Sequence, residues 1–171
     1  MTVPAPASEL DTTTVVVRPA TLTDVDALIE LRSVMFDTTD RDPGPEEDTW
    51  QRACRQILLD GLTAGDLLGA VAETDDGTVV ASGIATLRRW LPSPTNPSGL
   101  TGYIGSMATV DEWRRQGIGR RITETLIAML TERGAADIDV HPTEVGEGVY
   151  RSLGFTEPST GTGLTLHTNA D

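Results

Sequence analysis

Apolar residues recur at spacings of three and four residues in three stretches of the chain, which is the period of an amphipathic helix. Thr21 and Thr23 precede the first stretch, and each is followed three residues later by an aspartate, a pattern typical of a helix N-cap. Glycines follow the second and third stretches and favour helix ends there. The spacing therefore predicts helices that extend to about Phe36, from near Trp50 to near Gly61, and from Gly117 to Gly134, with a short fourth helix at 148–153.

Apolar runs of strand length, rich in β-branched residues, separate these helices. Asp75-Asp76-Gly77 lies between two such runs and predicts a hairpin, which makes the two strands antiparallel. The runs before and after the third helix are expected to be parallel neighbours joined by a right-handed crossover. The predicted strands are Thr13–Arg18, Leu67–Thr74, Thr78–Arg89, Gly102–Val110, Ala136–His141, Phe155–Glu157 and Gly163–Thr168.

A length of 171 residues fits one domain, which we place at 13–171 after a loose N-terminal tail at 1–12. No window approaches the roughly 18 apolar residues of a membrane span, and the N-terminal residues lack the pattern of a signal peptide. We therefore expect a cytoplasmic protein with no membrane partner. The single cysteine, Cys54, has neither a disulfide partner nor a CxxC motif, and no metal is expected.

The formal net charge is −13, and all 13 basic residues are arginines. Nucleic acid is not an expected partner, because phosphate backbones are bound by net basic surfaces. The negative field either attracts cationic ligands such as amines or serves solubility alone.

Four of the arginines lie within eight residues, around the loop Arg115-Gln116-Gly117-Ile118-Gly119-Arg120 that leads into the third predicted helix. A helix N-terminus presents unpaired N–H groups and the positive end of its dipole to an anion, and glycines let a phosphate approach the backbone. A dinucleotide-binding motif requires glycine where Ile122 stands, and a P-loop requires a lysine. The loop is thus interpreted as a phosphate site of another kind.

These residues resemble the GNAT superfamily of N-acetyltransferases. The family pattern R/Q-x-x-G-x-G/A is similar to Arg114-Arg115-Gln116-Gly117-Ile118-Gly119, and its Y-x-x-L-G-F segment is similar to 150–155. The resemblance, which covers 13–168, implies an α/β fold with a mixed sheet of six to seven strands and helices on both faces. The sheet would be splayed between two parallel strands, around Met107 and Ile138.

The resemblance also implies acetyl-CoA as co-substrate. Backbone groups of Met107, Ala108 and Thr109 would bind the pantetheine arm and the thioester, and residues 115–120 would bind the pyrophosphate. Tyr150 would protonate the leaving thiolate, although an aromatic packed in the core like Phe155 is the alternative. Thr143 stands where the family often carries an asparagine that contacts the cofactor.

The base that deprotonates the amine is not fixed by the sequence. His141, whose ordinary pKa is near neutral, is one candidate, and Glu73 and Asp139 are others, each with a structural or solvated role as the alternative. The carboxylates at 37–48 suggest a cationic small-molecule amine as acceptor, or simply a solvated acidic loop.

The absence of lysine and the isolation of Cys54 favour direct transfer over a covalent enzyme intermediate. A protein N-terminus or lysine side chain is the alternative acceptor. A non-catalytic acyl-CoA sensor on the same fold is the alternative of another class. A homodimer is plausible from the resemblance.

Overall fold

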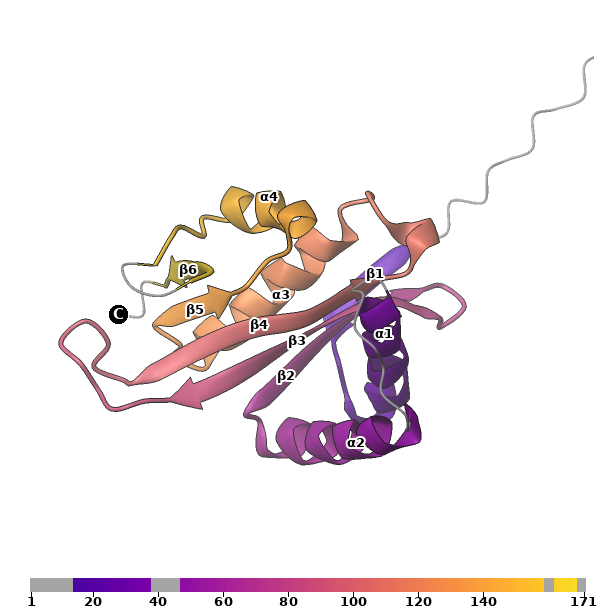
Figure 1. Cartoon of the computed structure of the whole chain (residues 1–171), viewed down its shortest axis with the longest axis horizontal. Helices are drawn as coiled ribbons and strands as arrows, with labels where there is room; N and C mark the ends of the chain where they lie inside the picture. The colour runs from indigo at the N-terminus through magenta and orange to yellow at the C-terminus, as the bar shows by residue number, and fades with distance from the viewer. Residues whose placement is uncertain (1–13, 38–46, 159–161, 169–171) are drawn as a thin grey trace, which may run out of the picture.

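The computed structural model describes residues 14–37, 47–158 and 162–168. Its strands form one six-stranded sheet in sequential order β1-β2-β3-β4-β5-β6 (Figure 1). All neighbouring pairs are antiparallel except β4 and β5, which are parallel as predicted. The strands are β1 (Val15–Pro19), β2 (Leu67–Thr74), β3 (Val79–Arg89), β4 (Leu100–Thr109), β5 (Asp137–Val140) and β6 (Leu164–His167).

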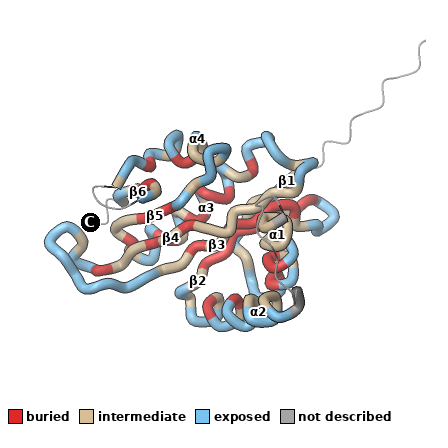
Figure 2. Tube along the Cα trace, viewed as in Figure 1, coloured by how far each residue is buried: buried red, intermediate tan, exposed pale blue. Residues whose placement is uncertain are grey.

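Helices cover both faces of this sheet (Figure 1). One face carries α1 (Val25–Asp37) and α2 (Glu47–Ala64), whose apolar side chains form one core cluster with Val71. The other face carries α3 (Ile118–Glu132) and α4 (Glu144–Ser152), which contribute to the larger cluster. Buried residues accordingly concentrate on the central strands and on the faces of the helices that pack against them (Figure 2). Among the described residues, none of the helices has the length and hydropathy needed to cross a membrane.

The amphipathic pattern of α3 accounts for the core of the second face. Ile122, Leu126 and Leu130, four residues apart, are each 0% exposed and pack onto β2, β3 and β4. Gly102 and Gly83 leave room for these side chains, since an added Cβ would lie within 3 Å of Leu130 and of Ile122 respectively. The packing holds the N-terminus of α3 at the end of β4.

Some predicted element bounds and one predicted strand were wrong. The second helix continues past Gly61 to Ala64, and Gly65 rather than Gly61 has the left-handed conformation (φ +80°) that ends a helix. The fourth helix begins at Glu144, capped by Thr143, several residues before the predicted start. Residues 155–157 form no strand and contribute only a single bridge between Thr156 and Thr165.

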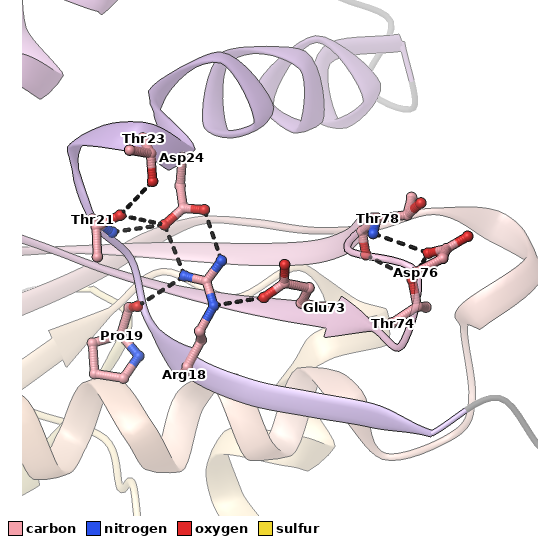
Figure 3. Close-up of polar contacts among 9 residues, drawn as sticks. All are labelled: Arg18, Pro19, Thr21, Thr23, Asp24, Glu73, Thr74, Asp76 and Thr78. Carbon is pink, nitrogen blue, oxygen red and sulfur yellow. Dashed lines mark hydrogen bonds and ion pairs between the residues drawn. The ribbon is translucent and has the colours of Figure 1, made fainter.

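A polar cluster joins β1 to the start of α1 and to β2 (Figure 3). The Arg18 guanidinium donates two hydrogen bonds to the Asp24 carboxylate (2.8 and 2.9 Å) and one to Glu73 (2.7 Å). Asp24 also accepts from the Thr21 N–H at 2.7 Å, which confirms the predicted cap. The Arg18 guanidinium holds the pKa of the buried Asp24 carboxyl below its usual value.

Candidate active site

The end of β4 is irregular on one side and open on the other. The pairing with β3 shifts by one residue between Ser82 and Ile84, and Ser106 at this bulge has φ +50°, a conformation that costs a residue other than glycine free energy. β5 pairs only with Thr101–Ile104 of β4. Among the described residues, β4 beyond Ile104 therefore has no strand partner on its β5 side, as a splayed sheet requires.

Backbone alternation decides which groups of β4 face this open side. The Val110 N–H donates to the Val80 carbonyl on β3 at 3.0 Å, and Ala108 is the register partner of Ser82 on the same strand. Because successive residues of a strand point their N–H and C=O groups in opposite directions, Met107 and Thr109 present theirs to the open side. The predicted backbone contacts to pantetheine fit Met107 and Thr109, whereas the backbone groups of Ala108 face β3.

The loop that follows is a cradle of backbone amides. Arg115 has φ +62° and Gly117, the N-cap of α3, has φ +75°. Among the described residues, the N–H groups of residues 115–120 have no hydrogen-bond acceptor, and the first turn of α3 contains no acidic residue. An added Cβ at Gly117 or Gly119 would meet nothing within 4 Å. Six consecutive amides with an open approach to them are suited to a pyrophosphate, and the binding of a pyrophosphate here stays a prediction.

The arginines around the loop differ in how they are held. Arg114 donates to the Thr109 carbonyl at 3.0 Å and pairs with Asp111 at 2.8 Å. Arg120 pairs with Glu124 (2.9 Å) and donates to the Ser152 hydroxyl on α4 (2.7 Å). The side chain of Arg115 is exposed, and the described residues give it no ion pair. Arg115 and Arg120 remain the predicted cationic contacts for a phosphate.

Tyr150 lies on the inner face of α4 and is 6% exposed. Its ring packs edge-on against Phe155 with the centroids 5.6 Å apart, within the same cluster as Met107 and Ile104. Burial raises the pKa of the Tyr150 hydroxyl to about 12, while hydrogen bonding to the Thr123 side chain opposes this shift. The hydroxyl therefore stays protonated at neutral pH, as a proton donor must, in a position that also contributes to the core.

The remaining predicted site residues and candidate bases differ in exposure and in their hydrogen-bond partners. His141 is exposed just after β5, with its ring 5.7 Å from that of Tyr103 and its Nε2 3.4 Å from the Thr162 hydroxyl. The Thr143 hydroxyl accepts from the Gly146 N–H at 3.3 Å as the N-cap of α4. The candidate bases Glu73 and Asp139 are bound by Arg18 and by the Thr165 hydroxyl respectively. The role of each of these residues in catalysis stays a prediction.

A cavity of about 540 Å³ lies on the other face of the sheet, between α1, α2 and strands β2 to β4. It adjoins the bulge, because Ser106 forms part of its wall and accepts a hydrogen bond from Arg32 of α1. Sequence reasoning placed an acceptor site near the first two helices but missed Arg32 and Ser106. The wall consists of Leu28, Arg32, Phe36, Trp50, Ala53, Cys54, Ile57, Leu58, Leu67, Ile84 and Ser106.

The described wall of this cavity contains no carboxylate. The acidic residues that suggested a cationic acceptor lie outside the described residues at 38–46, or belong to the side chains of Asp37, Glu47 and Asp48, which are not described either. The described residues also contain no group of three or more His, Cys, Asp and Glu side chains placed to hold a metal ion.

Comparison with solved structures shows the fold of known acetyltransferases. A predicted acetyltransferase from Clostridium acetobutylicum, solved with acetyl-CoA, is 21% identical and superposes with a TM-score of 0.77 over 87% of this chain and 94% of the other. A GCN5-related N-acetyltransferase from Ralstonia eutropha is 27% identical, with a TM-score of 0.75 over 87% of this chain and 97% of the other. An aminoglycoside N-acetyltransferase in complex with CoA is 16% identical, with a TM-score of 0.68 over 90% and 95% of the two chains.

The chain matches no curated protein sequence. The family described as the Acetyltransferase (GNAT) family matches residues 26–155, a span that includes α1 except Val25, the open end of β4, the amide cradle and Tyr150. This match covers well over half of the chain. The protein belongs to the GNAT family of acetyltransferases.

Proposed function

We propose that this protein transfers an acetyl group from acetyl-CoA directly to a primary amine within a ternary complex. The observation that carries the proposal is the cradle of unpaired amides at 115–120, located immediately after the open end of β4 in a chain of the GNAT family. The family match supports the reaction type, and the geometry of the cradle supports the donor. The solved relatives that hold acetyl-CoA or CoA add to this support.

Acetyl-CoA, when bound, supplies an acetyl thioester, which is the activated form of the group to be transferred. The amides of 115–120 and the side chains of Arg115 and Arg120 would bind the pyrophosphate by charge-assisted hydrogen bonds. The backbone groups of Met107 and Thr109 that face the open side of β4 would align the pantetheine arm. The arm would then lead from the cradle toward the bulge at Ser106, next to the cavity.

Tyr150 is proposed to donate a proton to the sulfur as the carbon–sulfur bond breaks. Its raised pKa keeps the hydroxyl protonated, and its burial excludes water that would otherwise compete as a partner. The base that receives the proton of the amine stays open, with His141 and bulk water as candidates. Burial raises the pKa of the Cys54 thiol although the charge of Arg32 opposes this shift, and the raised pKa favours direct transfer over an acetyl-cysteine intermediate.

Release of the CoA thiol in the presence of a broad panel of amines tests this proposal. We expect amine-dependent thiol release that Tyr150→Phe lowers in kcat by about 10²-fold or more, the range typical of general acid catalysis. Acetyl-CoA affinity and thermal stability are measured for the same variant, so that a folding defect is recognised.

Turnover by Tyr150→Phe close to wild type would remove the acid role and leave Tyr150 as a core aromatic. Binding of acetyl-CoA without transfer to any amine would instead indicate a non-catalytic acyl-CoA sensor. Preference for peptide N-termini or lysine side chains over small amines would assign the protein acceptor. A preference for polyamines or aminoglycosides would confirm the cationic acceptor predicted from the acidic loop.

A further inference from the structure

We infer that the acceptor is an α-amino acid with a large apolar or aromatic side chain, and that Arg32 binds its carboxylate. This inference rests on the proposed function, because it concerns the second substrate of the same reaction. It departs from the cationic acceptor predicted from the sequence, and the difference comes from the described wall of the cavity between α1, α2 and the sheet.

The wall of the cavity is apolar over most of its extent. Leu28 and Phe36 contribute from α1, Trp50 and Ile57 from α2, and Ile84 from β3, and the Phe36 and Trp50 rings meet edge-on with centroids 5.5 Å apart. A polyamine or an aminoglycoside would lose hydration of its charges against such a wall without gaining hydrogen bonds. A volume of about 540 Å³ is in the range of small-molecule sites and accommodates an aromatic side chain.

Arg32 is the only charged residue among the described residues of this wall. Its guanidinium lies 4.9 Å from the centre of the Phe36 ring and donates to the Ser106 hydroxyl. The described residues give Arg32 no ion pair, and its side chain is only partly exposed. A planar cation with several donors at the edge of an apolar cavity is suited to a carboxylate, which it binds through two parallel hydrogen bonds.

The position of Arg32 relative to the bulge decides which kind of carboxylate fits. Because Arg32 contacts Ser106, the cationic end of the cavity is the end that adjoins the open side of β4, where the thioester is proposed to lie. The amine must reach the same end to attack. If the amine and the carboxylate are attached to one carbon, both groups can lie at the Arg32 end of the cavity. The side chain of such an acceptor can then contact the apolar wall. An α-amino acid meets this condition, and its zwitterion is not repelled by a chain of net charge −13.

The ammonium of the bound zwitterion first loses one proton to solvent, which leaves a neutral amine. A bond forms between the neutral amine nitrogen and the acetyl carbon, the carbon–sulfur bond breaks, and the sulfur takes the proton of Tyr150. The nitrogen releases one proton to solvent, and Tyr150 regains one from solvent. The products are an N-acetyl amino acid and the free thiol of CoA, with no change of oxidation state.

Three matched acceptors test the role of the carboxylate: L-phenylalanine, L-phenylalaninamide and phenethylamine share one side chain and differ at the carboxyl group. We expect kcat/KM to be highest for L-phenylalanine by at least about 10-fold, because a hydrogen-bonded charge pair is worth that much or more. L-Alanine tests the apolar wall and is expected to be a poorer substrate than L-phenylalanine. Spermidine and an aminoglycoside represent the cationic class.

The Arg32→Met variant removes the charge while keeping an unbranched apolar side chain. We expect it to raise the KM for L-phenylalanine by about 10- to 100-fold and to leave the KM for phenethylamine within about 3-fold. Arg52→Met is the matched control, since Arg52 is exposed on α2 and lies outside the wall. Arg32→Lys keeps a cation but loses the planar pair of donors. Its KM for L-phenylalanine is expected to lie between those of the wild type and Arg32→Met.

A binding measurement independent of turnover uses Cys54, the single cysteine of the chain, which lies in the wall. L-Phenylalanine or its N-acetyl product is expected to slow alkylation of Cys54 by iodoacetamide, followed as intact protein mass, in the wild type but not in Arg32→Met. Phenethylamine at the same concentration is expected to protect Cys54 less.

The outcomes separate the two proposals. Transfer to phenethylamine or spermidine at least as efficient as to L-phenylalanine would overturn the inference and leave the proposed function intact. Equal effects of Arg32→Met on all three phenyl acceptors would also overturn it. Absence of transfer to every amine would refute the proposed function, and protection of Cys54 by L-phenylalanine would then still identify the cavity as an amino-acid site, whereas absence of protection would overturn both.

Discussion

Tyr150 has a place in the core and, in the proposed mechanism, also the role of proton donor. Its ring packs on Phe155 and is 6% exposed, and the same burial raises the pKa of its hydroxyl to about 12. Desolvation disfavours the phenolate, so the residue that stabilises the fold is also kept in its acid form. The two roles are separable by experiment, because only one of them depends on the hydroxyl.

The raised pKa of Tyr150 predicts a dependence of stability on pH. A group whose pKa is about 10 when unfolded and about 12 when folded stabilises the protein fully below pH 10, and this contribution is lost as pH rises toward 12. Relative to Tyr150→Phe, the wild type is expected to lose about 1.4 kcal/mol of unfolding free energy between pH 8 and pH 11. Urea unfolding of both proteins across this range measures the difference. A constant difference would mean that the hydroxyl is exposed to solvent.

The two glycines of the cradle differ in conformation and in their expected roles. Gly117 has φ +75°, so any other residue there is strained, whereas the φ of Gly119 lies outside the left-handed region and its surroundings are open. We expect Gly119→Ala to fold as well as the wild type, with a gain of up to about 1 kcal/mol from helix propensity. Its KM for acetyl-CoA is expected to rise about 10-fold or more, because the methyl group would block the pyrophosphate.

Gly148→Ala is the matched control for Gly119→Ala. Gly148 also lies in a helix, with nothing within 4 Å of an added Cβ, but away from the cradle. Thermal melting and the KM for acetyl-CoA are compared for both variants. A normal KM in Gly119→Ala would place the pyrophosphate elsewhere.

At the scale of residues, the sequence marks the loop at 115–120 but does not mark the cavity between α1, α2 and the sheet. The cradle is formed by consecutive residues, so its motif is visible in the chain. Arg32 lies on α1 and Ser106 on β4, so the fold brings them together from distant parts of the chain. Neither residue lies in a sequence motif that would indicate its position in the cavity. The left-handed backbone of Ser106 arises from a register shift against β3, which follows from strand pairing rather than from local composition.

Among the elements, those with long periodic patterns were predicted most closely. The β2–β3 hairpin and α3 were found almost to the residue, because alternation, turn residues and apolar spacing agree there. The end of α2 was misplaced because Gly61 resembles a stop signal but is buried against Leu67, where an added Cβ would lie 2.4 Å from the side chain. Gly61 is thus required for close packing within the helix, and Gly65 ends it.

Ion pairs within one polar cluster hold β1 and α1 together (Figure 3). The cluster consists of Arg18, Asp24 and Glu73. Asp24→Asn is expected to destabilise the fold by about 2 kcal/mol at pH 7, because a buried hydrogen bond to a charged group is weakened. The pKa of Asp24 is lowered in the folded state, so its contribution is present above the ordinary carboxyl pKa and is lost as pH falls. The difference between wild type and variant should therefore shrink toward pH 3.

Glu73→Gln is the matched control for Asp24→Asn, since the Glu73 side chain is 30% exposed and its pair with Arg18 is screened by solvent. We expect it to cost less than about 1 kcal/mol. Thermal or urea unfolding at pH 7 and pH 3 measures both variants. An equal cost for the two substitutions would contradict the assignment of Asp24 as the buried partner.

On the scale of the whole molecule, the sites proposed for the two substrates lie on opposite faces of the sheet. The cradle stands at the N-terminus of α3, which packs on one face of the sheet, and the cavity lies on the face covered by α1 and α2. The open side of β4 near Ser106 adjoins both. With the proposed sites, acetyl-CoA and the amine would be bound together, and Cys54 would have no required chemical role.

Initial rates of thiol release, measured while acetyl-CoA and the amine acceptor are both varied, distinguish direct transfer from an acetylated enzyme intermediate. Direct transfer in a ternary complex predicts reciprocal plots that intersect, and a Cys54→Ala variant that retains this pattern with near wild-type kcat. Parallel plots, with activity lost in Cys54→Ala, would show an acetylated enzyme intermediate and would contradict direct transfer in a ternary complex.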